Sequence, residues 1–560
     1  MITGSHAVIK SLIEEGIKVI FGYPGGQIIP IYDALYDYKE EINHVLVRHE
    51  QGAVHAAEGY ARATGRVGVC FATSGPGATN LVTGIADAMI DSVPVLCITG
   101  QVGSNLLGSD AFQEVDMIGI TTPITKWNYQ ITDAAEIPQI IAKAIYIART
   151  GRPGPVVIDI ARNAQISNLD FSYKKCSFIE SYQPNYSPNL RQIKSAAELI
   201  NKAKRPLVLS GHGVIISQAQ NELLTLIEKA SLPTAFTLLG LSTFPSRHPL
   251  NMGMLGMHGN YGPNILTNKA DVILAIGMRF DDRVTGRLAN YAKQARIIHI
   301  DIDPAELNKN VRADIPLVAD AKIALKALIP LIEKKSRSNW LTEFNKYQKI
   351  EKERVIHKEI HPKGNYITMA EVINLLSEKT SGKAVIVADV GQHQMITARY
   401  YQSEKTNNFI TSGGLGTMGY ALPAAIGAQI GTPKNQVIAI IGDGSFQMNI
   451  QELATIIQEK IPLKIIILKN NYLGMVRQWQ ELFYKKRYSF TDLYSPDFVA
   501  LAKSYTLKAK KIIKRSQLNS CLSDFLKSKR PYLLEINVKN KHNVFPMIPL
   551  GASVDEIRLE

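Results

Sequence analysis

VIAIIGDGSFQMNIQELATIIQEKIPLKIIILKNN, residues 437–471, is the stretch that decides the fold. Its apolar runs 437–441 and 463–468 predict two buried parallel strands, and residues 449–459 between them predict a helix. Parallel strands joined through a helix end at the same edge of their sheet. Asp443 follows the first strand and Asn470 lies 27 residues further on, after the second. The stretch therefore predicts an α/β fold with polar side chains gathered at the carboxyl edge of a parallel sheet.

These polar residues have the chemistry of a metal-bound diphosphate site. Carboxylate and amide oxygens, here from Asp443 and Asn470, suit Mg²⁺ when phosphate oxygens complete its octahedron. Gly442 and Gly444 allow the backbone to approach closely, and amide groups at a helix start attract an anion. The alternative is an ordinary Gly-Asp-Gly turn with unrelated asparagines downstream. The strand–turn–helix–strand context favours the metal site.

The stretch resembles the thiamine diphosphate motif shared by thiamine-dependent decarboxylases and carboligases. By its spacing from Asp443, Asn470 matches the second of two asparagines in that motif, the one that binds the metal. Lys469 replaces the first asparagine and Asn471 is an addition, so either Asn470 or Asn471 could be the ligand. The resemblance implies that the backbone carbonyl of Tyr472 completes the set of protein ligands.

Length and composition predict three domains. A chain of 560 residues is too long for one hydrophobic core. Near-continuous apolar strands alternating with helices predict parallel sheets covered on both faces. We expect three consecutive parallel-sheet α/β domains (1–165, 191–335 and 366–540) and a C-terminal tail (541–560) over the surface. The resemblance implies that these domains are of the thiamine diphosphate-enzyme type. It implies that the N-terminal domain binds the pyrimidine, that the central domain is FAD-binding-like, and that the C-terminal domain binds the diphosphate and Mg²⁺.

Charge and targeting features exclude several classes of protein. The net charge is +14, yet Lys and Arg are spread along the chain and no nucleic-acid recognition motif occurs. Anionic cofactors and an acidic partner explain such a charge better than nucleic acid does. No apolar run reaches about 18 residues, which predicts no membrane-spanning helix. An acidic amphipathic N-terminus and four scattered cysteines without metal spacing predict a cytoplasmic protein.

A second motif, VRHEQGAVHAAEGYARATGRVGV, occupies residues 47–69. Glu50 ends a predicted strand and begins a helix of small residues, where the helix dipole would favour any glutamate. The motif resembles the catalytic-glutamate segment of the thiamine family, which implies that Glu50 protonates the cofactor's aminopyrimidine. A carboxyl group in an apolar setting suits this role because desolvation raises its pKa. The family's site joins the first domain of one chain to the third domain of another, which implies a homodimer.

Two more segments resemble cofactor-binding parts of the same family. They are DVGQHQM, residues 389–395, and GGLGTMGYALPAAIGA, residues 413–428. The resemblance implies that Met418 supports the thiazolium ring and that the backbone of Gly416 lies near the aminopyrimidine. Packing in the core and an ordinary structural histidine are the alternatives for Met418 and His393. The remaining residues implied to contact thiamine diphosphate are Gln392, His393, Gly444 and Ser445.

Other segments resemble the large catalytic subunits of acetolactate synthases, and this resemblance covers essentially the whole chain. They are FGYPGGQIIPIYDAL (21–35), GSDAFQEVD (108–116), RFDDRVTG (279–286) and LGMVRQWQELFYKKRYS (473–489). The resemblance implies that Phe112 and Gln113 line the substrate side of the thiazolium. Arg283 is implied to contact the carboxylate of the second substrate. Trp479, on a helix with Val476, is implied to favour 2-ketobutyrate over pyruvate as acceptor.

The same resemblance implies FAD in the central domain, without an obvious redox role. Glycines there would permit close approach to a dinucleotide phosphate, and Asp301 after a predicted strand could accept a ribose hydroxyl. His212 interrupts the glycine run usual at this point. The implied FAD-binding residues are Arg152, Gly211, Gly213, Thr237, Leu238, Met257, His258, Gly277, Arg279, Asp301, Asp320 and Ala321.

The expected activity is the decarboxylation of pyruvate and its condensation with a second 2-ketoacid. Pyruvate as acceptor gives 2-acetolactate and 2-ketobutyrate gives 2-aceto-2-hydroxybutyrate, for valine, leucine and isoleucine biosynthesis. The resemblance also implies a small regulatory subunit as partner. The enzymatic alternative is pyruvate oxidase or another thiamine-dependent 2-ketoacid decarboxylase. A cofactor-binding protein without activity is the other alternative, and the presence of Glu50, Asp443 and Asn470 argues against it.

Overall fold

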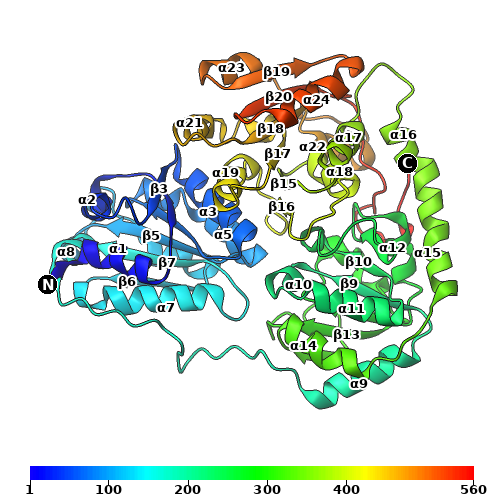
Figure 1. The fold of residues 1–560 in the computed structure, drawn as a ribbon, viewed down its shortest axis with the longest axis horizontal. Helices are drawn as coiled ribbons and strands as arrows, with labels where there is room; N and C mark the ends of the chain where they lie inside the picture. Colours follow the sequence, from blue (N-terminus) through cyan, green and yellow to red (C-terminus); the bar gives the residue numbers. More distant parts are fainter.

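The computed structural model describes residues 1–560 and contains three six-stranded sheets and a two-stranded ribbon. Every strand pair in the three large sheets is parallel, and helices cover their faces (Figure 1). The predicted class, three consecutive parallel-sheet α/β domains, is confirmed. The first sheet lies at the left of Figure 1, the second at the lower right and the third at the top.

The first sheet has the strand order β3-β2-β4-β5-β7-β6. Every residue of three of its four inner strands, β4, β5 and β7, is buried, as expected for apolar strands covered on both faces. The bounds are β2 Val19–Gly22, β3 Asn43–Leu46, β4 Gly68–Ala72, β5 Val95–Gln101, β6 Trp127–Ile131 and β7 Val156–Ala161, with α1 Gly4–Glu14, α2 Ile29–Tyr36, α3 Glu50–Thr64, α5 Val82–Asp91 and α7 Ile137–Arg149.

The second sheet has the order β11-β10-β9-β12-β13-β14. A long connection from the first sheet reaches it through α9, and this connection crosses the bottom of Figure 1. The bounds are β9 Pro206–Ser210, β10 Thr234–Phe236, β11 Asn251–Met254, β12 Val272–Ile276, β13 Arg296–Asp301 and β14 Ile315–Val318, with α9 Leu190–Lys202, α10 His212–Ile216, α11 Gln220–Ala230, α12 Tyr261–Thr267, α13 Asp282–Thr285 and α14 Ala321–Leu328.

The third sheet has the order β16-β15-β17-β18-β20-β19. Its central pair β17 and β18 contains the two strands predicted from the opening stretch; β17 ends one residue later than expected, and β18 begins and ends one residue later. The bounds are β15 Val385–Ala388, β16 Phe409–Thr411, β17 Val437–Gly442, β18 Lys464–Lys469, β19 Lys508–Ile512 and β20 Tyr532–Asn537, with α17 Met369–Thr380, α18 Gln392–Tyr400, α19 Ala421–Gly431, α20 Asp443–Phe446, α21 Leu453–Gln458, α22 Gly474–Phe483, α23 Phe498–Ser504 and α24 Leu518–Lys527.

The helix predicted at 449–459 is shorter than expected. It forms as a 3-10 turn, Ile450–Glu452, that leads into α21. The short helix α20 precedes it and begins at Asp443 itself. The turn after β17 is therefore helical from its first residue, which directs the backbone amides of this turn toward the carboxyl edge of the sheet.

The first and third domains pack together within the chain through α3 and α19. The contact depends on small residues, because a Cβ atom on Gly59 would lie 1.9 Å from the carbonyl oxygen of Ala424. A Cβ atom on Gly427 would lie 1.8 Å from the carbonyl oxygen of Ala56. The two helices thus approach at a distance that only glycine permits at these positions.

The C-terminal tail does not simply lie over the surface, as its sequence suggested. Ile548, Val554 and Ile557 are buried in the core of the central domain, and Val544 is buried against the third domain. Pro546 and Pro549 lie among these apolar residues without preventing them from packing, and the tail forms a 3-10 turn at Val554–Glu556. The preceding helical linker, α15 Ser338–Glu351 with α16 His357–Ile360, also buries Trp340 and Phe344 (right edge of Figure 1).

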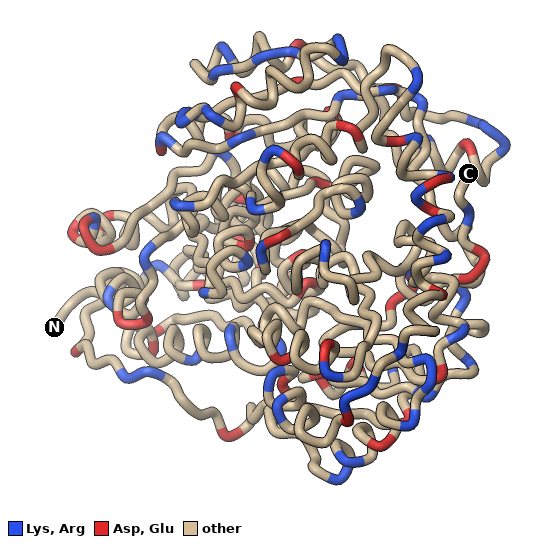
Figure 2. The backbone as a smooth tube through the Cα atoms, turned by 45° about the vertical axis from the view of Figure 1, so that its right-hand side comes forward, with Lys and Arg blue, Asp and Glu red and all other residues tan.

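Charged residues of both signs are interspersed along the whole backbone (Figure 2). The positive net charge therefore does not collect on one element. None of the helices is long and apolar enough to cross a membrane.

Candidate active site

A cavity of about 60 Å³ lies at the carboxyl ends of β17 and β18, where the sequence places the diphosphate site. Seven of the residues expected at the cofactor diphosphate or its metal line it, and so does Met418. The set is Gln392, His393, Met418, Asp443, Gly444, Ser445, Asn470 and Tyr472. The turn after β17, the turn after β18 and the start of α18 thus meet at one edge of the sheet.

The two expected side-chain ligands of the metal are fixed by hydrogen bonds from their own surroundings. One carboxylate oxygen of Asp443 accepts from the backbone N–H of Asn471 at 2.9 Å and from the hydroxyl of Ser495 at 2.8 Å. The amide oxygen of Asn470 accepts from the N–H of Tyr472 at 3.0 Å. Asn470 is buried and lines the cavity, whereas Asn471 is exposed and does not. These oxygens are hard donors that fit Mg²⁺.

His393 supports the turn that carries Asp443. Its Nε2 accepts a hydrogen bond from the N–H of Gly442 at 3.1 Å, and burial lowers the pKa of His393 to about 3. The ring is therefore neutral, and with Nε2 as acceptor the proton lies on Nδ1. A Cβ atom on either Gly391 or Gly442 would lie within 3 Å of this ring, so both glycines are needed for it to fit.

Asp389 joins this edge to the segment that carries Met418. Its buried carboxylate accepts from the N–H groups of Val390, Gly419 and Ala421 at 2.8–3.0 Å. Burial raises the pKa of Asp389 in spite of these hydrogen bonds. Met418 lies in this segment and lines both the small cavity and a much larger one beside it. The two cavities are therefore adjacent.

The larger cavity has a volume of about 1970 Å³ and is lined by residues of all three domains. This exceeds the usual size of a small-molecule pocket and suits a dinucleotide. Eleven of the twelve residues expected to bind FAD line it: Arg152, Gly213, Thr237, Leu238, Met257, His258, Gly277, Arg279, Asp301, Asp320 and Ala321. Gly416, expected near the aminopyrimidine, lines it as well.

Gly211 is the residue of this set that does not line the cavity. A Cβ atom there would lie 2.2 Å from the carbonyl oxygen of Gly277, so Gly211 allows β9 and β12 to end close together. His212, where the sequence departs from the usual glycine, does line the cavity. Burial lowers the pKa of His212 to about 4, which keeps the ring neutral at physiological pH.

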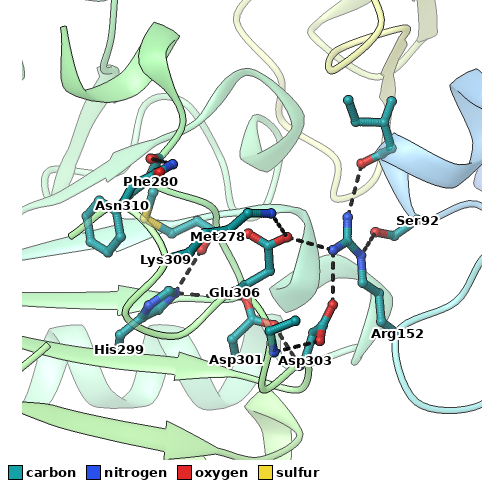
Figure 3. A network of polar contacts seen from close by, with 12 residues as sticks. Ser92, Arg152, Met278, Phe280, His299, Asp301, Asp303, Glu306, Lys309 and Asn310 are labelled. Carbon is teal, nitrogen blue, oxygen red and sulfur yellow. Dashed lines mark hydrogen bonds and ion pairs between the residues drawn. The ribbon is translucent and has the colours of Figure 1, made fainter. Parts of the chain in front are cut away.

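Arg152 lies in a network of polar contacts that sequence reasoning missed (Figure 3). One guanidinium nitrogen lies 3.1 Å from Asp303 and 3.0 Å from Glu306, and Nε donates to the Ser92 hydroxyl at 2.8 Å. The first domain is thereby joined to the loop after β13. Burial raises the pKa of the neighbouring Asp301 to about 7. Nothing in the sequence around Asp303 or Glu306 indicated a partner about 150 residues away.

Arg283 and Trp479, the two residues expected to handle the second substrate, come together. The Arg283 guanidinium lies 5.9 Å from the centroid of the Trp479 ring, within cation–π distance, and donates to the sulfur of Met257 at 3.4 Å. Both side chains line the large cavity. Val476, on the same helix as Trp479, lines both cavities. A substrate held by Arg283 would therefore lie beside the diphosphate edge.

Glu50 and Gln113 line neither of these cavities. Glu50 is the first residue of α3, is 9% exposed, and accepts from the side-chain amide of Asn80 at 3.0 Å. Gln113 has a positive φ of 59° and packs on Gly75, and the neighbouring Phe112 is 84% exposed. Within one chain, Glu50 and Gln113 are therefore not assembled with the residues of the diphosphate half.

Comparison with known families matches all three domains. Residues 2–120 match the N-terminal TPP binding domain of the thiamine pyrophosphate enzymes, residues 193–328 match their central domain, and residues 389–536 match their C-terminal TPP binding domain. The fold and the site thus define a thiamine pyrophosphate enzyme.

Relatives that align over 99% or more of this chain show to which family of thiamine pyrophosphate enzymes it belongs. A probable acetolactate synthase large subunit of Methanocaldococcus jannaschii is 48% identical over 99% of this chain and 95% of its own length. The acetolactate synthase large subunit of Corynebacterium glutamicum is 46% identical over 99% and 90%. The isozyme 3 large subunit of Escherichia coli K12 is 43% identical over 100% and 99%. The chain belongs to the family of acetolactate synthase large subunits.

Proposed function

We propose that the protein decarboxylates pyruvate and condenses the remaining two-carbon unit with a second 2-ketoacid. The products are 2-acetolactate from pyruvate and 2-aceto-2-hydroxybutyrate from 2-ketobutyrate, in the biosynthesis of valine, leucine and isoleucine. The observation that carries this proposal is the adjacency of two cavities. One holds Asp443 and Asn470, the other holds Arg283 and Trp479, and Met418 lines both.

Mg²⁺ and the diphosphate end of thiamine diphosphate are the proposed occupants of the small cavity, and the rings would extend past Met418 out of it. Asp443, Asn470 and the carbonyl of Tyr472 would hold the metal, and the proton on His393 Nδ1 is a donor for the diphosphate. Bound thiamine supplies the electron sink into which the bond to carbon dioxide can break. Met418 and the backbone of Gly416 would hold the rings in place.

FAD is the proposed occupant of the large cavity. Gly213 and Gly277 leave room for the backbone to approach a phosphate, and Asp301 and Asp320 are acceptors for ribose hydroxyls. Arg152 is already paired with two carboxylates, so its guanidinium has a fixed direction before any ligand binds. No electron transfer is assigned to this flavin.

The second 2-ketoacid is proposed to bind between Arg283 and Trp479. The planar guanidinium of Arg283 pairs with a carboxylate through two parallel hydrogen bonds. The face of Trp479 would contact the additional methyl group of 2-ketobutyrate. A contact of this kind discriminates by about 1–3 kcal/mol per methylene.

A second copy of the chain is proposed to supply Glu50, Gln113 and Phe112. Glu50 would exchange a proton with the ring nitrogen of the aminopyrimidine, while Gln113 and Phe112 would face the substrate. The support for this arrangement is that Glu50 lines neither cavity of its own chain. A symmetric dimer would place two such glutamates at two identical sites. The large-subunit names of the relatives also support a small regulatory subunit as a further partner.

The decisive experiment is acetolactate formation from pyruvate by the purified protein. Thiamine diphosphate, Mg²⁺ and FAD are omitted one at a time. We expect product only when thiamine diphosphate and Mg²⁺ are both present, and loss of product when FAD is removed. Consumption of pyruvate without acetolactate, with reduction of bound FAD, would replace the proposal with the pyruvate oxidase alternative. Consumption without acetolactate or flavin reduction would indicate a simple decarboxylase.

A further inference from the structure

The C-terminal tail contacts Gln392, which lines the diphosphate cavity, through one segment, residues 542–548, which we call the C-terminal strap. Its two ends are fixed to different parts of the molecule. Nε2 of His542 lies 2.9 Å from the carboxylate of Glu359 in α16, and Ile548 donates its N–H to the carbonyl of Met257 at 2.8 Å. The strap therefore connects the helical linker with Met257 of the central domain, which lines the large cavity. Between these two ends it contacts α22, where Asn543 donates to Glu481.

Gln478 of α22 holds the middle of the strap. The side chain is fully buried, and its amide pairs with the backbone of Val544 in both directions. Its Oε1 accepts from the N–H of Val544 at 2.8 Å, and its Nε2 donates to the Val544 carbonyl at 3.1 Å. Because the backbone of Val544 offers one donor and one acceptor, this pairing fixes which end of the amide carries oxygen.

The Gln478 oxygen also accepts from Nε2 of Gln392 at 2.9 Å. The same Gln392 nitrogen donates to the carbonyl of His542 at 2.7 Å, so both of its protons are used by the strap and Gln478. The Gln392 oxygen must therefore point away from Gln478 and the strap. It lies 2.2 Å from the position that a Cβ atom on Gly474 would take, and the side-chain nitrogen of Asn470 lies 2.8 Å from that position.

Hydrogen bonds between amides therefore lead from Val544 of the strap through Gln478 to Gln392. The Gln392 oxygen and the side-chain nitrogen of Asn470 both face the same position beside Gly474, at the metal edge of the site. We propose that Gln478 is a positioning residue that couples docking of the C-terminal strap to the binding of thiamine diphosphate and Mg²⁺. This inference rests on the proposed function, which assigns the small cavity to Mg²⁺ and the diphosphate end of the cofactor.

Replacing Gln478 by methionine tests this coupling. Gln478→Met preserves length and burial but leaves the N–H of Val544 and one proton of Gln392 without acceptors. Buried donors without partners are costly, so Gln392 and the strap should move until solvent satisfies them. The matched control is Gln429→Met in α19, because Gln429 is also buried in the third domain and makes three amide contacts away from both cavities.

The readout is the dissociation constant of thiamine diphosphate at saturating Mg²⁺, followed by protein fluorescence. We expect an increase of about tenfold for Gln478→Met, which corresponds to about 1.4 kcal/mol, and less than about twofold for Gln429→Met. KM for pyruvate at saturating cofactor should change less than about twofold in both variants. A purely structural role would lower the melting temperature of both variants similarly and leave the cofactor affinity unchanged.

Reciprocity supplies a second readout, since a ligand that is coupled to the strap must also stabilise it. Thiamine diphosphate with Mg²⁺ should slow tryptic cleavage after Lys539 and Lys541 in the wild-type protein, and much less so in Gln478→Met. An unchanged dissociation constant together with equal protection in both proteins would overturn the coupling while leaving the proposed function intact. A wild-type protein that does not bind thiamine diphosphate would overturn both.

Discussion

The diphosphate half and the pyrimidine half of the site differ in how complete they are within one chain. Asp443, Asn470 and His393 line one cavity and are fixed by hydrogen bonds from the same domain. Glu50 lines neither that cavity nor the adjacent one, and Phe112 next to Gln113 is almost fully exposed. The residues of the diphosphate half lie together at one sheet edge. Glu50 and Gln113 of the pyrimidine half have the expected chemical groups but line neither cavity of their own chain.

This difference indicates what each half requires. A binding edge formed by two neighbouring strands needs only the local fold, because the ends of parallel strands converge without help. The carboxyl group of Glu50, by contrast, would need a second protein surface to bring the bound cofactor to it. The same pair of domains also touches within the chain, through α3 and α19, and this contact does not bring Glu50 into either cavity.

Glu50→Gln should have the largest effect on activity. The amide keeps the shape of the side chain and its contact with Asn80 but cannot transfer a proton, so turnover should fall by about 10²–10⁴-fold. Acetolactate formation measures the loss, and thiamine diphosphate binding measured in parallel should change little. Glu40→Gln, at an exposed glutamate of the same domain, is the control. Near-normal turnover in Glu50→Gln would show that the pyrimidine half does not depend on this carboxyl group.

Asp443→Asn should act on the other half and mainly on metal binding. The substitution removes the only carboxylate among the proposed ligands, and the Mg²⁺ concentration for half-maximal activity should rise by about 10–100-fold. A Mg²⁺ titration at saturating thiamine diphosphate measures this. Asp524→Asn, at an exposed aspartate of the same domain, should leave the titration unchanged. If both variants titrate like the wild type, the metal is held elsewhere.

Trp479→Leu should alter specificity more than rate. The smaller side chain contacts the additional methyl group of 2-ketobutyrate less well, so the preference for this acceptor should fall by about tenfold. The measurement is the ratio of the two products formed from equal concentrations of pyruvate and 2-ketobutyrate. Phe483→Leu, at the aromatic neighbour of Trp479 on the same helix, separates this effect from a general loss of packing. An unchanged product ratio would remove Trp479 from the acceptor site.

Asp87→Asn should have the smallest effect, on the pH dependence of stability where the two domains touch. Burial, with repulsion from Glu58 and Asp91, raises the pKa of Asp87 to about 8. The folded protein therefore holds a proton that the unfolded chain releases near pH 4, and stability falls as the pH rises from about 4 to about 8. The asparagine can still accept from Ser412.

Melting temperatures between pH 5 and pH 8 measure this effect. The wild-type value should decrease with pH more steeply than that of Asp87→Asn. Asp170→Asn, at an exposed position, should follow the wild type. Parallel curves for all three proteins would show that Asp87 does not titrate in this range.

Sequence reasoning located the strands that have continuous apolar runs and the residues that follow them. Residues 437–441 and 463–468 satisfy this condition and form β17 and β18. It did not identify β6, whose residues WNYQI mix polar and apolar side chains because the strand lies at the edge of its sheet and is only half buried. Edge strands lack the uniform burial that makes an inner strand recognisable.

The residues that sequence reasoning missed in the site share a different property. Asp303 and Glu306 pair with Arg152, and Gln478 pairs with Gln392 and Val544. Each contact joins segments that are far apart in the chain, and none has a local spacing that would predict it. The apolar residues of the tail were also expected at the surface, because the prolines and glycines around them are typical of surface segments.

The central claim is that a complete site takes Glu50 from one copy and Asp443 from another. Mixing Glu50→Gln protein with Asp443→Asn protein, under conditions that allow subunit exchange, tests it directly. Half of the dimers would then be mixed, and each mixed dimer would hold one site with both residues intact. About a quarter of the wild-type activity should return. A mixture as inactive as its two components would place Glu50 and Asp443 of the same chain in one site and contradict the claim.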